Sequence, residues 1–106
     1  MIFNELIINN KQDLFRLCKE HQVKSLFAFG SVVTENFDLE KSDIDLLVEF
    51  DEPDPLKKGE KILSFWNKME DFFKRKVDLL TNSNIRNPYL KQSIDATKIL
   101  IYEASK

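Results

Sequence analysis

The chain has 106 residues, of which 42% are hydrophobic and 32% charged, with only 2 Gly and 3 Pro. This length predicts one domain spanning 1–106, and the composition is too apolar for a disordered segment. The 16 basic and 18 acidic residues give a net charge of -2, which argues against direct binding of nucleic acid. The single cysteine, Cys18, excludes an internal disulfide and a multi-cysteine zinc site.

The N-terminal segment, MIFNELIINN, lacks the basic start and long apolar run of a secretory signal peptide. No stretch approaches the roughly 20 apolar residues that span a bilayer. We therefore expect a cytoplasmic protein that makes no contact with a membrane. The sequence leaves the oligomeric state open, so a homo-oligomer stays an alternative to a monomer.

The first half of the chain predicts a helix followed by two strands. Leu14 and Cys18 lie at helical spacing within 11–21, and Cys18 is interpreted as a small apolar residue of that helix. The apolar run 25–30 predicts a buried strand that ends at glycine. The clearest strand is 43–50, which is rich in strand-forming residues.

The second half predicts a loop, a long helix, two strands and a shorter helix. Two prolines and a glycine predict a loop at 51–59. The long helix follows, because six apolar residues recur at steps of three and four and form one stripe for core packing: Ile62, Phe65, Trp66, Met69, Phe72 and Phe73. A short strand is expected at 77–81, and Pro88 suits the first position of a helix over 88–97. The segment 98–103 is a fourth strand or the end of that helix, and we favour the strand.

This alternation predicts an α/β fold with a small mixed sheet flanked by helices. Most of the helical packing is expected on one face of the sheet. A polar site is expected on the opposite, exposed face.

Asp43 and Asp45 are the first candidates for a functional site. Residues two apart in a strand project from the same face, so the two carboxylates lie side by side. Two like charges at such a short distance destabilise the fold unless a cation lies between them. Mg²⁺ is a suitable cation because it binds oxygen ligands. Solvated turn residues before an edge strand are the alternative interpretation.

Gly30 and Ser31 follow the buried strand directly. A glycine there lets the backbone approach an anion closely, and a serine hydroxyl can bind phosphate oxygens. An ordinary strand-ending turn is the alternative. The combination is more specific than its parts: an apolar strand, Gly-Ser, eleven residues, then Asp-Ile-Asp opening a second strand.

This combination resembles the signature of the DNA polymerase beta-like nucleotidyltransferase superfamily. The segment SDIDLLV (42–48) is similar to that of its minimal members, the MNT proteins. The resemblance covers nearly the whole chain and makes Asp78 the matching third carboxylate. It implies that Gly30 and Ser31 bind the nucleotide. It also implies that Asp43 and Asp45 hold Mg²⁺ ions bridging the triphosphate, and that Asp78 completes the second metal site and acts on the attacking hydroxyl.

The resemblance also implies an activity and a partner. A nucleotidyltransferase of this kind transfers AMP from ATP to a hydroxyl, usually on a tyrosine of a companion HEPN-domain ribonuclease toxin, and so acts as an antitoxin. A binding antitoxin that silences its partner by contact alone is the main alternative. A small-molecule nucleotidyltransferase is a third possibility, although such enzymes usually carry an extra substrate-binding domain.

One segment departs from the family pattern. Many minimal members have arginine and glycine soon after Gly-Ser, in the form GSxARG, whereas Val32–Glu35 stand here. A cation that could contact the triphosphate is therefore missing from this position. The run Lys74–Lys76 is interpreted as a solvated helix end, with attraction of phosphates as the alternative. His21 is interpreted as a surface residue and not as a catalytic group.

Overall fold

The computed structural model describes residues 7–30, 43–82 and 85–104. Along the chain it contains α2 (Lys11–Glu20), β1 (Val23–Phe29), β2 (Ile44–Phe50), α3 (Pro55–Phe73), β3 (Val77–Leu80), α4 (Pro88–Thr97) and β4 (Ile99–Glu103). The mixed α/β fold is confirmed, and so is the choice of a strand for the segment after Thr97. Ser31 and Val32–Glu35 lie outside the described residues.

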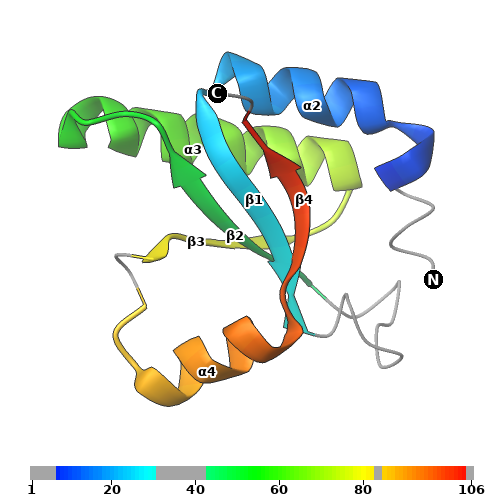
Figure 1. Ribbon diagram of the computed structural model, residues 1–106. Coiled ribbons are helices and arrows are strands. Elements are labelled where there is room, and N and C mark those ends of the chain that lie inside the picture. The colour runs from blue at the N-terminus through cyan, green and yellow to red at the C-terminus, as the bar shows by residue number, and fades with distance from the viewer. Residues whose placement is uncertain (1–6, 31–42, 83–84, 105–106) are drawn as a thin grey trace.

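The four strands form one sheet in the order β3-β2-β1-β4. β1 pairs antiparallel with both β2 and β4, whereas β2 and β3 are parallel. Helices α2 and α3 cover one face of this sheet, and α4 lies against the other (Figure 1). The carboxylates predicted for β2 and β3 are thereby placed on neighbouring strands.

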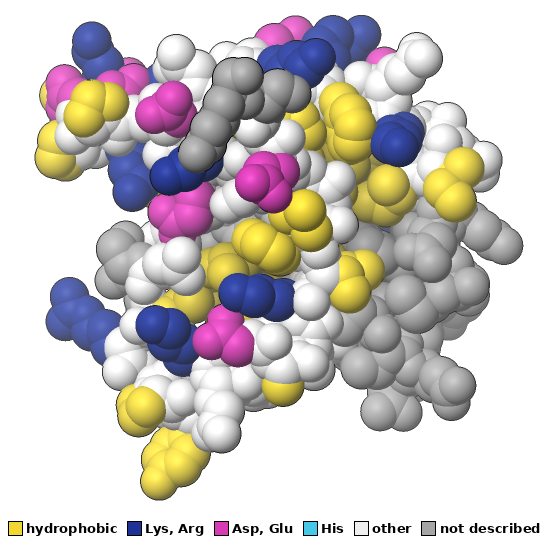
Figure 2. Space-filling view, viewed as in Figure 1, with side chains coloured by type: hydrophobic (Ala, Val, Ile, Leu, Met, Phe, Trp, Pro, Cys, Tyr) yellow, Lys and Arg dark blue, Asp and Glu magenta, His cyan; other side chains and the backbone are white. Residues whose placement is uncertain are grey.

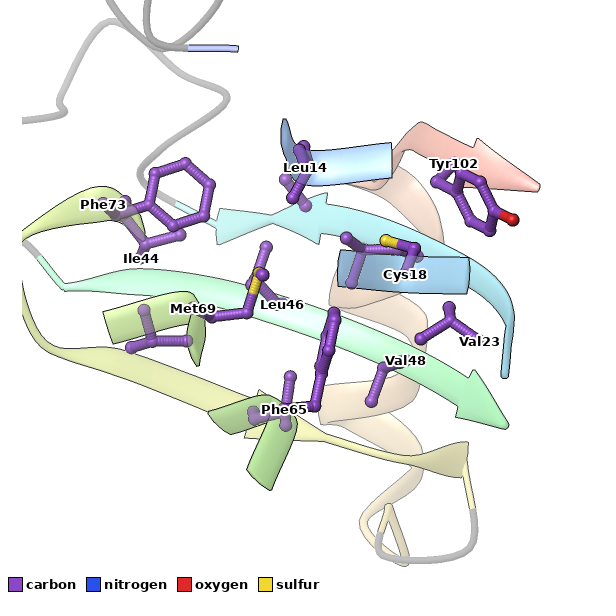
Figure 3. Packing of buried hydrophobic residues seen from close by; sticks show 14 of the residues in the cluster. Leu14, Cys18, Val23, Ile44, Leu46, Val48, Phe65, Met69, Phe73 and Tyr102 are labelled. Atoms are coloured by element: carbon purple, nitrogen blue, oxygen red, sulfur yellow. The ribbon is translucent and has the colours of Figure 1, made fainter. Parts of the chain in front are cut away.

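The main core lies between the sheet and the pair α2 and α3, as Figure 3 shows. Its buried side chains come from every strand and from both of these helices, and they include Leu14, Cys18, Leu26, Ile44, Leu46, Val48, Phe65, Met69, Phe73, Val77 and Tyr102. The burial of Cys18 confirms its interpretation as a small apolar residue. Burial also raises the pKa of its thiol to about 12, so the thiol stays protonated at neutral pH.

The side chains of β1 and β2 alternate between the two faces. Leu26 and Ala28 join the main core, whereas Phe29 packs with Leu47 and Ile94 in a smaller cluster under α4. Positions two apart from Leu47 along β2 therefore project toward the α4 face. The face on which the polar site was predicted is this one, but it is not fully exposed as expected, because α4 buries Phe29 and Leu47 there.

The prediction of a loop over 51–59 is wrong in its second half, because α3 already begins at Pro55. Asp54 is the N-cap and accepts a hydrogen bond from the N–H of Leu56 at 2.9 Å. Proline at the first helical position costs little, since its missing N–H would have no partner within the helix. Gly59 is accommodated inside the helix.

The apolar stripe of α3 also positions β3. Phe65, Met69 and Phe73 are buried as predicted, but Trp66 is 36% exposed at the margin of the core. The Trp66 indole N–H donates to the carbonyl of Val77 at 2.7 Å, and Glu70 accepts from the N–H of Val77 at 3.1 Å. Two side chains of α3 therefore hold the start of β3, one residue before Asp78.

His21 is not a surface residue, and that interpretation is corrected here. Its side chain is buried because the α2–β1 turn lies against α3, with the ring edge-on to Phe65. Nδ1 donates to the carbonyl of Leu17 at 2.8 Å, which leaves Nε2 to accept from the hydroxyl of Ser64 at 2.9 Å. These contacts give His21 a structural role in joining α2 to α3.

Candidate active site

Asp45 of β2 and Asp78 of β3 lie side by side. The parallel register pairs Ile44 with Val77 and Asp45 with Asp78. Because Ile44 and Val77 belong to the main core, the two aspartates project from the opposite face. The structure thus brings together two residues that are 33 positions apart in the sequence and that the resemblance had matched to one site.

The environment of Asp45 disfavours its negative charge. Burial raises the pKa of this carboxyl most strongly, followed by the charge of Asp78, the hydrogen bond to Asp78 and the charge of Asp43. Together they raise the pKa of Asp45 from 3.8 to about 6. A divalent cation between these oxygens would offset the repulsion, and carboxylate oxygens are the ligands that a hard metal ion prefers.

We predict that Asp45→Asn stabilises the ligand-free protein at alkaline pH. Since the folded-state pKa lies above the unfolded value, the protonated carboxyl favours folding below about pH 4, and this stability is lost as pH rises through about 6. Asparagine avoids that loss. The expected gain near pH 8 is about 1–2 kcal/mol, because a partly exposed group realises less than the full shift. Urea unfolding should give little difference near pH 4, and a clear loss of stability at both pH values would mark Asp45 as structural.

Asp43 and Lys76 lie directly before β2 and β3, two residues before Asp45 and Asp78. They precede Ile44 and Val77, which are paired, and the N–H of Ile44 donates to the carbonyl of Lys76 at 3.1 Å. The ammonium of Lys76 lies 4.0 Å from Oδ2 of Asp43. Asp43 therefore lies opposite Lys76, just as Asp45 lies opposite Asp78, and all four side chains lie on one face of the sheet.

The position of the Asp45 carboxylate requires a glycine at position 30. Its φ is +73°, and a Cβ atom at this position would lie 2.6 Å from Oδ2 of Asp45. Any other residue would therefore be strained and would push the carboxylate aside. The N–H of Gly30 donates to Oγ1 of Thr97 at 3.3 Å, so in this structure it is engaged inside the protein.

Thr97, the last residue of α4, was not identified from the sequence as part of the site. Its hydroxyl donates to the carbonyl of Ser93 at 3.0 Å and accepts from the N–H of Gly30. A contact across 67 residues leaves no local pattern that could reveal it. Thr97 therefore fixes the turn that carries Gly30 next to Asp45.

We predict that Thr97→Val lowers the free energy of unfolding by about 1 kcal/mol, because the isosteric valine leaves the Gly30 N–H without its acceptor. Thr97→Ser keeps the hydroxyl and serves as the matched control. Urea unfolding of both variants measures the effect. Equal stability of the valine and serine variants would show that this hydrogen bond contributes nothing measurable.

Within residues 7–30, 43–82 and 85–104, no three His, Cys, Asp or Glu side chains converge into a group that could hold a metal ion. Asp45 and Asp78 face each other, whereas Asp43 lies toward Lys76. The metal-binding roles of the three aspartates, and the nucleotide-binding roles of Gly30 and Ser31, stay predictions.

Comparisons with known proteins agree with this fold. Residues 12–106 match the family model described as "Polymerase beta, Nucleotidyltransferase". A relative from Methanocaldococcus jannaschii named "Putative protein adenylyltransferase MJ0126" is 37% identical over 97 residues, covering 92% of each chain. The match to the family model spans most of the sequence, and the chain therefore belongs to the polymerase beta nucleotidyltransferase family.

Solved structures place it more narrowly among the minimal members. One described as "Structure of putative minimal nucleotidyltransferase" has a TM-score of 0.63 at 26% identity, covering 90% of this chain and 92% of that one. Another contains a "tri-AMPylated Shewanella oneidensis HEPN toxin in complex with MNT antitoxin" and has a TM-score of 0.53 at 17% identity, covering 90% and 71%. The resemblance to MNT domains inferred from the sequence is confirmed. In the part of the chain that the structure describes, no helix is long and apolar enough to cross a membrane.

Proposed function

We propose that this protein transfers AMP from ATP to a hydroxyl of a partner protein, with the tyrosine of a HEPN-domain toxin as the acceptor, and that it thereby acts as an antitoxin. The observation that carries the proposal is the pairing of Asp45 with Asp78 beside Gly30. Asp43 lies on the same face, two residues before Asp45. Acidic side chains in this arrangement suit a cation-dependent reaction of phosphate esters.

The transfer step follows from the chemistry of a nucleoside triphosphate. The acceptor oxygen attacks the α-phosphorus and forms a new P–O bond, while the bond to the oxygen bridging the α- and β-phosphorus breaks and pyrophosphate leaves. The hydroxyl proton passes to the carboxylate of Asp78. Bound Mg²⁺ would supply charge neutralisation for the attacking and leaving oxygens.

The residues of this chain have separate tasks in that step. Asp43 and Asp45 would hold Mg²⁺ and so position the triphosphate, and Asp78 would share the second ion and orient the acceptor hydroxyl. Gly30 leaves the space that the Asp45 carboxylate needs. Ser31 would contribute its hydroxyl to a phosphate oxygen.

A protein acceptor is supported by the relatives and by the surface. The M. jannaschii relative carries the name of a protein adenylyltransferase, and the Shewanella oneidensis complex pairs an AMPylated HEPN toxin with an MNT antitoxin. Leu100 of β4 is 51% exposed and Leu90 of α4 is 42% exposed. Hydrophobic side chains also gather over the sheet in the middle of the view in Figure 2, and exposed apolar surface of this kind suits contact with a protein.

The transfer assay uses the purified chain, radiolabelled ATP, Mg²⁺ and a HEPN-domain protein from the same genome, taken first from the neighbouring reading frame. The proposal expects label in the partner and a mass increase of one or more AMP groups on a tyrosine. Mg²⁺ omission provides the control. A partner that binds the chain tightly and is silenced without gaining mass would overturn the transfer activity.

That last outcome would establish the second candidate, an antitoxin acting by contact alone. The absence of a three-residue metal-holding group among the described residues favours it. The segment Val32–Glu35, which has no lysine or arginine, favours it as well. The intact Asp45–Asp78 pair argues against it, because a purely binding surface gains nothing from two carboxyl groups that destabilise each other.

We predict that Mg²⁺ together with ATP raises the melting temperature, because a ligand that binds only the native state adds RT ln(1 + [L]/Kd) to its stability. At a ligand concentration about tenfold above Kd, a chain of this size should gain roughly 5 °C. Differential scanning fluorimetry measures the shift, and Asp45→Asn serves as the control that should show little of it. An unchanged melting temperature at millimolar ATP and Mg²⁺ would contradict an intact site.

A further inference from the structure

Lys76 is a basic residue whose side chain lies beside an aspartate of the site. Lys76 lies directly before β3, and its ammonium is 4.0 Å from Asp43. Its side chain is 70% exposed, so it is free to reorient, and an exposed ion pair of this length contributes little to stability. Lys76 therefore needs no structural role at this position.

The sequence adds a second reason to consider Lys76. Val32–Glu35, which follow Gly30 and Ser31, contain no lysine or arginine, and Lys41 is the one basic residue in the sequence between Gly30 and Asp43. A triphosphate carries several negative charges, and three aspartates alone would repel it. A cation on the same face as Asp43, Asp45 and Asp78 would offset part of that repulsion.

We propose that Lys76 is the residue that binds the triphosphate tail of the nucleotide. In the free protein its ammonium is paired with Asp43, and on nucleotide binding it moves to the phosphate oxygens, which frees Asp43 to take part in metal binding. Lysine suits this role because its ammonium is a compact charge with three donors on a flexible stem. This inference rests on the proposed function, because it concerns the nucleotide of the same site.

The experiment compares Lys76→Gln with Lys24→Gln, which makes the same change of charge near the other end of the sheet, where Ala104 pairs with Lys24. The affinities for AMP-PNP and for AMP are measured by calorimetry at saturating Mg²⁺. We expect Lys76→Gln to weaken AMP-PNP binding by about tenfold and AMP binding by less than about twofold, since only AMP-PNP carries the β- and γ-phosphates. Lys24→Gln should leave both affinities unchanged, and Lys76→Arg should restore most of the loss.

A separate titration with Mn²⁺ alone tests the pairing with Asp43. Removing the ammonium should leave Mn²⁺ affinity unchanged or increase it, because Lys76 and the cation compete for the same carboxylate. Opposite effects on Mn²⁺ and AMP-PNP would therefore support the inference. Unfolding experiments on each variant exclude a general loss of structure.

Three outcomes would overturn the role of Lys76. AMP-PNP could bind the Lys76→Gln variant as tightly as the parent, or AMP-PNP and AMP could lose affinity equally, which would indicate only a general effect of charge. In either case the proposed nucleotide transfer would stand. Failure of the parent protein itself to bind AMP-PNP with Mg²⁺ would overturn both the role of Lys76 and the proposed function.

Discussion

Asp43→Asn, Asp45→Asn and Asp78→Asn should each reduce nucleotide transfer to the partner by at least about a hundredfold, while the fold and partner binding persist. Asparagine keeps the shape of the side chain but removes the charge that is proposed to hold a divalent cation. Loss of Asp43 or Asp45 should weaken the binding of metal and triphosphate together. Loss of Asp78 should mainly slow the chemical step, because its expected task is at the attacking hydroxyl.

The measurement follows labelled ATP into the partner under single-turnover conditions, with a pull-down of each variant in parallel. Asp51→Asn is the matched control, since Asp51 is exposed and follows the other end of β2. It should label the partner at the parent rate. Retention of the parent rate by all three site variants would refute the catalytic assignment.

The fold could be predicted from the sequence because its strands and helices carry strong local patterns. The strand at 43–50 and the apolar stripe of α3 lie within a few residues of their observed bounds. Pro88 was expected at the first turn of a helix, and α4 begins there, with Asn87 accepting from the N–H of Tyr89 at 2.9 Å. Patterns of this kind are local, so one sequence suffices to detect them.

The two wrong predictions concern residue types that occur in two opposite structural settings. Proline marks a loop, but after a capping Asp54 it also starts a helix, and α3 uses Pro55 in the second way. A polar residue at a helix end is usually exposed, yet His21 is buried because Ser64 of α3 supplies a partner for its ring. Neither choice can be made without the contacts of the tertiary structure.

In the candidate site, too, some features could be identified from the sequence and others only from the structure. Asp43 and Asp45 were identified from strand periodicity, and Asp78 only from the resemblance to the family, because a single aspartate in a short strand has no local signature. The structure added the pairing of Asp45 with Asp78 and the contact of Gly30 with Thr97. Both depend on which strands are neighbours and on where α4 ends.

Gly30→Ala should lower the free energy of unfolding by about 1–3 kcal/mol and reduce nucleotide transfer by at least about tenfold. Two physical causes contribute to the loss of stability. The φ of +73° strains an L-residue, and the added Cβ would lie 2.6 Å from the Asp45 carboxylate and displace it. Displacement by a few tenths of an ångström would be enough to disturb a site in which two carboxyl groups are proposed to share a cation.

A double-mutant cycle separates the two causes of the Gly30→Ala defect. In an Asp45→Ala background the clashing oxygen is gone, so Gly30→Ala should then cost only the backbone strain of about 1 kcal/mol. Gly59, the other glycine of the chain, provides the matched control: a Cβ there meets nothing within 4 Å, and Gly59→Ala lies inside α3. It should stabilise the protein by about 0.5–1 kcal/mol, the opposite sign to Gly30→Ala, because alanine is the better helix former. If Gly30→Ala costs the same with and without the Asp45 carboxylate, the two residues are not coupled, and Gly30 serves only the turn.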